Sequence, residues 1–201
     1  MPRRNVRLPD SYTILGAAGA VAACVGLIIL VRQFAAAPAP AARHDPRSDP
    51  PARWKYIVVH HSASDAGNAE TFDQWHRQKG WKSLGYHFVI GNGDGCGDGE
   101  VQAGPRWAEQ SPGAHCLTRD EQFNEHGIGI CLVGNFEQSR PTPAQLAALN
   151  DLIARLAREY HIRPENILGH NEALARAGET RTTKCPGKNM DMDAIRNAAP
   201  R

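Results

Sequence analysis

The sequence predicts an α/β domain in which a mixed central β-sheet is flanked by helices. Three almost wholly apolar runs predict buried strands, because strands covered on both faces lose the polar alternation of half-exposed ones. These runs span residues 56–60, 86–90 and 127–134. Helical patterns lie between and after them, and strands that alternate with helices build an α/β sandwich. We expect a mixed sheet because several connections are too short for a parallel crossover.

Two helices are visible in the pattern. Within residues 69–79 apolar side chains recur at helical spacing, and Gly80 follows as a stop. A longer helix begins where Thr142 and Gln145 form a capping box around Pro143, a residue favoured at the first helical position. The apolar stripe of this helix consists of Leu146, Leu149, Ile153, Leu156 and Tyr160.

The N-terminal part of the chain predicts export. Arg3, Arg4 and Arg7 precede an almost uncharged apolar stretch that is long enough to cross a bilayer as a helix. Basic residues on that side predict a cytoplasmic N-terminus. We therefore expect three segments ahead of a folded domain at 53–201, which would lie in the periplasm or outside the cell. They are a cytoplasmic N-terminus (1–10), an inner-membrane signal anchor (11–33) and a Pro/Ala-rich linker (34–52).

Two other interpretations of the N-terminal apolar segment stay open. Cleavage near Ala35-Ala36-Ala37 would release the domain as a secreted protein. The sequence that ends at Cys24 resembles a lipobox, which would give a lipid anchor. The apolar run continues to Val31, which favours Cys24 as a small apolar residue within a membrane helix.

The charge distribution argues against nucleic-acid binding. The chain carries 23 Lys and Arg against 21 Asp and Glu, but residues 1–52 hold six of the basic residues and three of the acidic ones. Residues 53–201 therefore have 17 basic and 18 acidic residues. Such a nearly neutral domain lacks the positive field that DNA or RNA binding requires.

Three short motifs that lie far apart in the chain supply possible metal ligands. They contain His60 in Val-His-His-Ser, His170 in Gly-His-Asn-Glu and Cys185 in Thr-Lys-Cys-Pro-Gly. Zinc favours imidazole and thiolate ligands, and three protein ligands leave a fourth position for water. His61 should face the opposite side of its strand from His60, so we expect it to make a structural hydrogen bond. On spacing alone, surface histidines remain an alternative.

Together with their local settings, these motifs resemble the zinc-dependent N-acetylmuramoyl-L-alanine amidases, which include phage T7 lysozyme-type enzymes and peptidoglycan recognition proteins. The resemblance covers nearly all of residues 54–190. It also includes Gly-Tyr-His-Phe-Val-Ile, Pro-Gly-Ala-His and Gly-Ile-Gly-Ile-Cys-Leu-Val-Gly-Asn. It implies that residues 53–201 are a zinc amidase domain with an amidase/peptidoglycan recognition protein-like fold, here preceded by the N-terminal transmembrane helix.

The resemblance also implies the roles of the site residues. His60, His170 and Cys185 would bind Zn²⁺, and Tyr86 would orient water or donate to the developing oxyanion. Thr183 stands where T7-type enzymes have a lysine, so its hydroxyl would be an uncharged donor. The neighbouring Lys184 is an alternative donor. The implied reaction is hydrolysis of the amide between the muramoyl lactyl group and L-alanine in peptidoglycan, by a domain that we expect to be a monomer.

Two other classes of function stay open. A recognition module would hold muropeptides without cutting them, and noncatalytic relatives usually lack a zinc ligand, most often the cysteine. A structural anchor between membrane and wall is suggested only by the linker. The cytosolic anhydromuramoyl-peptide amidases fit poorly, because they have Asp in place of the zinc cysteine.

Other histidines and cysteines carry weaker expectations. His115 would line the cleft or make a structural hydrogen bond, whereas His126 would be solvated. Cys131 would be a buried apolar residue. Cys96 and Cys116 lie in loops, and a disulfide between them is possible in an exported domain.

Overall fold

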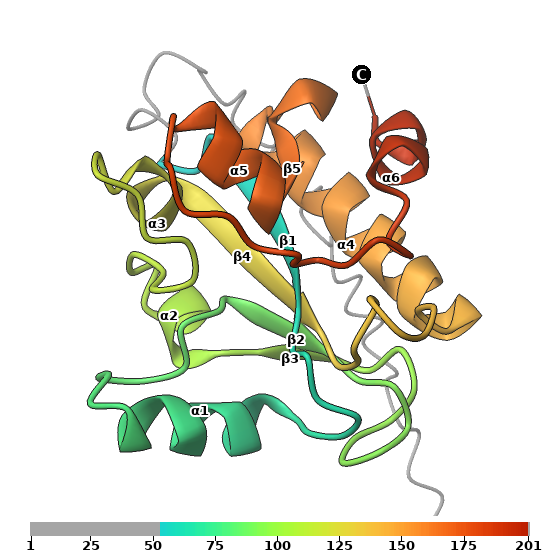
Figure 1. The fold of residues 1–201 in the computed structure, drawn as a ribbon. Helices are drawn as coiled ribbons and strands as arrows, with labels where there is room; N and C mark the ends of the chain where they lie inside the picture. Colours follow the sequence, from blue (N-terminus) through green and yellow to red (C-terminus); the bar gives the residue numbers. More distant parts are fainter. Residues whose placement is uncertain (1–52, 201) are drawn as a thin grey trace, which may run out of the picture. The chain divides into compact units, whose positions relative to one another are not determined.

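A five-stranded sheet with the strand order β3-β2-β4-β1-β5 forms the centre of the domain (Figure 1). The computed structural model describes residues 53–200. The strands are β1 Tyr56–His61, β2 Phe88–Ile90, β3 Val101–Ala103, β4 Gly127–Leu132 and β5 Ile167–Gly169. The helices are α1 Ala69–Gln78, α2 Pro105–Ala108, α3 Gln122–Glu125, α4 Pro143–Tyr160, α5 His170–Arg176 and α6 Met192–Ala198, with a 3-10 turn at Pro164–Asn166.

The strand pairing confirms the mixed sheet. β1 pairs in parallel with β4 and with β5, and β2 pairs in parallel with β4. Among the strands of residues 53–200, only β3 runs antiparallel, against β2. The short β3 strand was not predicted, because its sequence is mostly exposed and its apolar signal is correspondingly weak.

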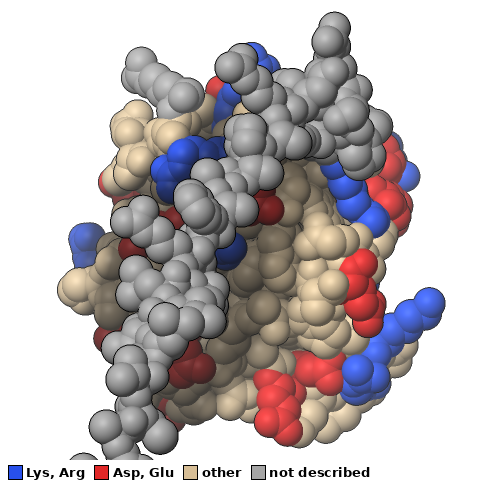
Figure 2. Space-filling view, turned by 180° about the vertical axis from the view of Figure 1, so that it is seen from behind, with Lys and Arg blue, Asp and Glu red and all other residues tan. Residues whose placement is uncertain are grey.

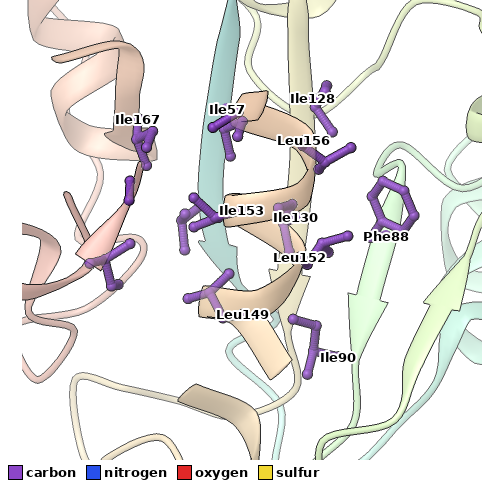
Figure 3. Close-up of a cluster of buried hydrophobic side chains, with 14 of the residues drawn as sticks. Ile57, Phe88, Ile90, Ile128, Ile130, Leu149, Leu152, Ile153, Leu156 and Ile167 are labelled. Carbon is purple, nitrogen blue, oxygen red and sulfur yellow. The ribbon is translucent and has the colours of Figure 1, made fainter. Parts of the chain in front are cut away.

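One face of the sheet is covered by α4 and α6. The predicted capping box begins α4: the Thr142 side chain accepts from the Gln145 N–H, and the Gln145 side chain accepts from the Thr142 N–H. The apolar side of α4 then packs against the isoleucines of β1 and β4 (Figure 3). Labelled members of this cluster include Ile57, Ile128, Ile130, Leu149, Ile153 and Leu156. This face is the main hydrophobic core of the domain.

The other face carries α1 and α5, together with the short α3 (Figure 1). Phe72 of α1 packs with Val89 of β2, and Phe123 of α3 packs with Val58 of β1. Figure 2 shows the molecule from behind relative to Figure 1, and basic and acidic side chains both occur on its visible part. His60, the predicted metal ligand on β1, points to the face of the sheet that carries α1 and α5.

The strand predicted at residues 86–90 begins two residues late. The Gly129 N–H of β4 donates to the ring Nδ1 of His87 at 2.9 Å, so a side chain takes the place of a backbone acceptor there. The His87 N–H still donates to the Gly129 carbonyl of β4, and the His87 carbonyl accepts from the N–H of Gly104, the residue after β3. Tyr86 therefore lies just ahead of β2, outside the strand.

The disulfide between Cys96 and Cys116, which the sequence left open, is not formed. Both are free thiols. Cys116 is fully buried next to Phe123, whereas the partly exposed Cys96 donates to the carbonyl of Gly67 at 3.4 Å. The two cysteines thus have separate surroundings and do not contact each other as a disulfide. Cys131, in contrast, is buried as predicted.

The predicted anchor (11–33) and linker (34–52) lie outside the described residues, and so do their cleavage and lipidation alternatives. Within residues 53–200, every helix is too short or too polar to span a bilayer. The membrane anchor and the inner-membrane location stay predictions.

We predict that His87 makes the domain sensitive to acid. Its Nδ1 accepts from the Gly129 N–H and its Nε2 donates to the Ser111 carbonyl. Both hydrogen bonds can form together only when the ring is neutral, because a charged ring has no acceptor nitrogen. Burial lowers the His87 pKa to about 4. Between this value and about 6.5 the unfolded chain binds the extra proton, so the free energy of unfolding falls as the pH falls through that window. The loss from pH 7 to 4.5 should be roughly 2–3 kcal/mol from this residue.

Urea unfolding at pH 7 and 4.5 measures this contribution. In a His87→Asn variant the amide oxygen still accepts but does not titrate, so the variant should lose less stability between the two pH values than the parental chain. An equal loss in both proteins would show that His87 is not the acid-sensitive group.

Candidate metal centre

The parallel pairing of β1 with β5 brings two predicted ligands together. In this register Val59 lies opposite Gly169, so the next residues, His60 and His170, are neighbours across the strand pair. Their ring centroids are 4.6 Å apart. Carboxyl ends of parallel strands commonly carry ligand sites in α/β proteins. The site therefore lies where β1 and β5 end.

Strand alternation separates the two adjacent histidines of β1. His60 points to the face that carries Tyr86 and His170, and its side chain is buried. His61 points to the opposite face, where its Nδ1 accepts from the Phe136 N–H at 3.1 Å. The expected structural hydrogen bond of His61 is therefore confirmed.

A loop from the far end of the chain brings Cys185 to the histidines. The Cys185 carbonyl accepts from the Asn171 N–H at 2.9 Å, which satisfies one of the free donors at the start of α5. Gly169 permits this approach, because a Cβ there would lie 2.8 Å from the Cδ of Pro186. The His61 N–H also points to the Cys185 sulfur at 3.4 Å.

The end of β5 is held by a charged network. The Gly169 N–H donates to the Glu172 carboxylate at 2.8 Å, so Glu172 caps the first turn of α5, the helix that begins at His170. Two nitrogens of Arg196 on α6 bind the same carboxylate at 2.8 and 3.1 Å. Glu172 therefore acts as the cap of α5. The contribution of Arg196 had no local signal in the sequence.

The three side chains form a group suited to one metal ion. One ligand atom from each of His60, His170 and Cys185 lies within 4.8 Å of the other two. The His60 Nδ1 and the Cys185 Sγ are 3.6 Å apart. Tetrahedral zinc with bonds of about 2.0–2.3 Å requires ligand separations of roughly 3.5 Å. Both the donor types and their spacing therefore fit Zn²⁺.

The electrostatics of the group favour uncharged imidazoles. Burial lowers the pKa of His60 well below its ordinary value, and the nearby His170 and His115 lower it further. Burial, with a smaller effect of Arg181, lowers the His170 pKa to about 4. Both rings are therefore neutral at pH 7 and can offer lone pairs to a cation.

Cys185, in contrast, must lose its proton and become a thiolate in order to bind a metal ion. Burial raises the Cys185 pKa to about 12, and the His61 N–H opposes this rise. A divalent cation at the group would supply the positive charge that stabilises a buried thiolate. The three residues are thus prepared to bind a metal ion together.

Tyr86 lies beside the group. Its ring centroid is 5.2 Å from that of His60 and 6.5 Å from that of His115. Burial, with smaller effects of Cys131 and Cys185, raises its pKa well above the usual value. The phenol therefore keeps its proton at neutral pH and can act as a hydrogen-bond donor.

Thr183 and Lys184 are placed differently from each other. The Thr183 hydroxyl oxygen accepts from the Cys185 N–H at 3.2 Å, which leaves its own O–H as a possible donor. Lys184 is exposed, and its ammonium group lies 3.9 Å from the Glu137 carboxylate. The structure therefore pairs Lys184 with a surface acid and holds Thr183 against the backbone of Cys185.

Two further histidines were predicted with mixed success. His115 is buried, binds His60 through a ring–ring hydrogen bond of 3.0 Å and also lines the adjacent cavity. His126 was expected to be solvated, but this expectation is wrong. Its Nδ1 lies 3.0 Å from the Arg53 carbonyl in a half-buried position, because the segment before β1 runs alongside it.

A cavity of about 710 Å³ opens next to the metal group. His115 and His170 form part of its wall, and Trp81 and Leu117 add exposed apolar surface. Three basic side chains and one acidic side chain also line it: Lys82, Arg106, Arg181 and Glu121. The cavity can thus hold a ligand that combines apolar and anionic parts.

Comparison with known proteins agrees with this geometry. A family model described as N-acetylmuramoyl-L-alanine amidase matches residues 50–188, more than half of the chain. The chain belongs to this amidase family. The resemblance inferred from the sequence motifs is therefore confirmed.

Individual relatives support the same assignment. The endolysin of Enterobacteria phage T3 is 34% identical over 119 residues, which cover 55% of this chain and 72% of the endolysin. Among solved structures, the N-acetylmuramoyl-L-alanine amidase LysC from Clostridium intestinale URNW is 29% identical, with a TM-score of 0.59 over 72% of this chain and 84% of LysC. A Drosophila PGRP-LB variant in complex with tracheal cytotoxin is 26% identical, with a TM-score of 0.52 over 69% and 78% of the two chains.

Proposed function

We propose that this chain is a zinc-dependent hydrolase that cleaves the amide between N-acetylmuramoyl residues and L-alanine in peptidoglycan. The observation that carries the proposal is the group of His60, His170 and Cys185 beside a cavity of about 710 Å³. When bound, Zn²⁺ would lower the pKa of its water towards about 7 and polarise the scissile carbonyl. A recognition module that only binds muropeptides would have no need for three ligands that leave a position open.

The residues of the chain have separate tasks in this reaction. His60, His170 and Cys185 hold the ion, and their neutral rings and single thiolate leave the site with net positive charge. Tyr86 keeps its phenolic proton and donates to the oxygen that becomes negative in the transition state. Thr183 fixes the backbone of Cys185, and its free O–H is a second, uncharged donor.

The overall reaction is a hydrolysis. The hydroxyl of water adds to the lactyl carbonyl carbon, and the bond from that carbon to the alanine nitrogen breaks. The nitrogen takes a proton and leaves as an amine, while the lactyl group leaves as a carboxylate. Stem peptides carry carboxylates, and Lys82 and Arg181 at the cavity supply matching positive charge.

We predict that metal removal abolishes the release of muropeptide products. The full chain is incubated with purified peptidoglycan before and after treatment with a chelator, and the products are identified by mass spectrometry. Stem peptides with a free L-alanine amine should form only in the presence of zinc, and added zinc should restore them. A Cys185→Ser variant should be at least about 100-fold slower, because a thiolate ligand is lost.

The Cys96→Ser variant is the matched control, since Cys96 is a free thiol outside the metal group. It should keep the parental rate. Binding to peptidoglycan without any product, or equal cleavage by the zinc-free chain, would contradict the proposed activity.

We also predict that Tyr86→Phe lowers kcat by roughly 100-fold, as expected for the loss of one oxyanion donor. KM and zinc content should change little, because the phenol acts on the transition state and is not a ligand. Tyr160→Phe on α4 serves as the control. A Tyr86→Phe enzyme within about threefold of the parental kcat would exclude the donor role.

A further inference from the structure

His115 connects a metal-ligand candidate to the backbone of β4. Its Nε2 lies 3.2 Å from the carbonyl oxygen of Gly127, and its Nδ1 lies 3.0 Å from the Nε2 of His60. Both rings are buried, with exposed fractions of 8% for His115 and 1% for His60. Within residues 53–200, neither ring hydrogen-bonds to a carboxylate.

This chain of contacts determines where each proton sits. A carbonyl oxygen can only accept, so the Nε2 of His115 carries its hydrogen and donates to Gly127. The Nδ1 of the neutral His115 ring is then an acceptor, and the Nε2 of His60 must donate to it. The Nδ1 of His60 is left without a proton. This is the nitrogen that lies 3.6 Å from the Cys185 sulfur.

The surroundings of His115 hold its ring in this orientation. A Cβ at Gly113 or at Gly129 would lie 2.4 Å from the His115 Cδ2, so both glycines are needed for the ring to fit between them. The backbone N–H of His115 donates to the Asn124 side chain at 2.9 Å. The ring is therefore held by its own backbone and by the strand next to it.

We propose that His115 is a positioning residue that holds His60 in the tautomer whose Nδ1 is free to bind the metal. A neutral histidine can carry its proton on either nitrogen, and only one of these forms offers Nδ1 as a ligand. Partners of this kind commonly affect metal affinity by about 10–100-fold. The inference rests on the proposed function, since it concerns the same metal group.

Two substitutions separate the hydrogen bond from simple packing. His115→Leu fills most of the space but removes the acceptor, whereas His115→Asn keeps an acceptor oxygen near the position of Nδ1. Zinc affinity is measured on the full chain by competition with a chromogenic chelator. The Leu variant should bind zinc at least about tenfold more weakly than the parental chain, and the Asn variant should stay within about threefold.

The tautomer itself is measured on the zinc-free full chain by long-range ¹H–¹⁵N NMR spectra of the imidazole rings. His60 should carry its proton on Nε2 in the parental and Asn proteins and show a mixture of tautomers in the Leu protein. His87→Asn is the control, because His87 also hydrogen-bonds to β4 but to neither metal-ligand histidine. It should change stability without changing the His60 tautomer or the zinc affinity.

The outcomes distinguish this inference from the proposed function. A parental chain that binds no zinc would overturn the proposed function, while the His60 tautomer would still test the role of His115. A proton on Nδ1 of His60 in the parental chain would overturn the inference, even if the Leu variant does not fold. Parental zinc affinity in a folded Leu variant would overturn it as well.

Discussion

The parallel pairing of β1 with β5 is the constraint on which the site depends. The register that sets Val59 opposite Gly169 makes His60 and His170 neighbours, although they are far apart in the chain. A shift of β1 by one residue would turn His60 into the α4 face and bring His61 to the ligand face. The buried apolar side chains of β1 prevent such a shift, since Ile57 and Val59 belong to the main core. The hydrophobic core therefore fixes the metal geometry.

Three further contacts depend on this register. Gly169 lets the loop with Cys185 approach, Glu172 and Arg196 hold the start of α5, and the His61 N–H points to the ligand sulfur. Their common effect is to hold two neutral rings and one thiol in a buried place that is costly for a thiolate alone. A divalent cation removes that cost. The same arrangement that destabilises the free thiolate thus provides affinity for a metal.

The elements whose signals are local could be predicted from the sequence. Strand alternation assigned different faces to His60 and His61, and Thr142 with Gln145 predicted the start of α4. Contacts between distant segments carry no such signal. The position of Tyr86 ahead of β2 depends on the His87 ring bond to Gly129, and the hydrogen bond from His60 to His115 depends on two glycines that make room for a ring. The metal group itself was predicted through resemblance to a family, because its ligands have no regular spacing.

The most direct test of the account is X-ray absorption at the zinc edge of the zinc-loaded full chain. If His60, His170 and Cys185 hold the ion, the first shell should contain one sulfur at about 2.3 Å and nitrogen or oxygen atoms at about 2.0–2.1 Å. The Cys185→Ser variant should lose the sulfur contribution and keep the lighter atoms. A parental spectrum without sulfur, or one with two sulfurs, would contradict the metal centre described above.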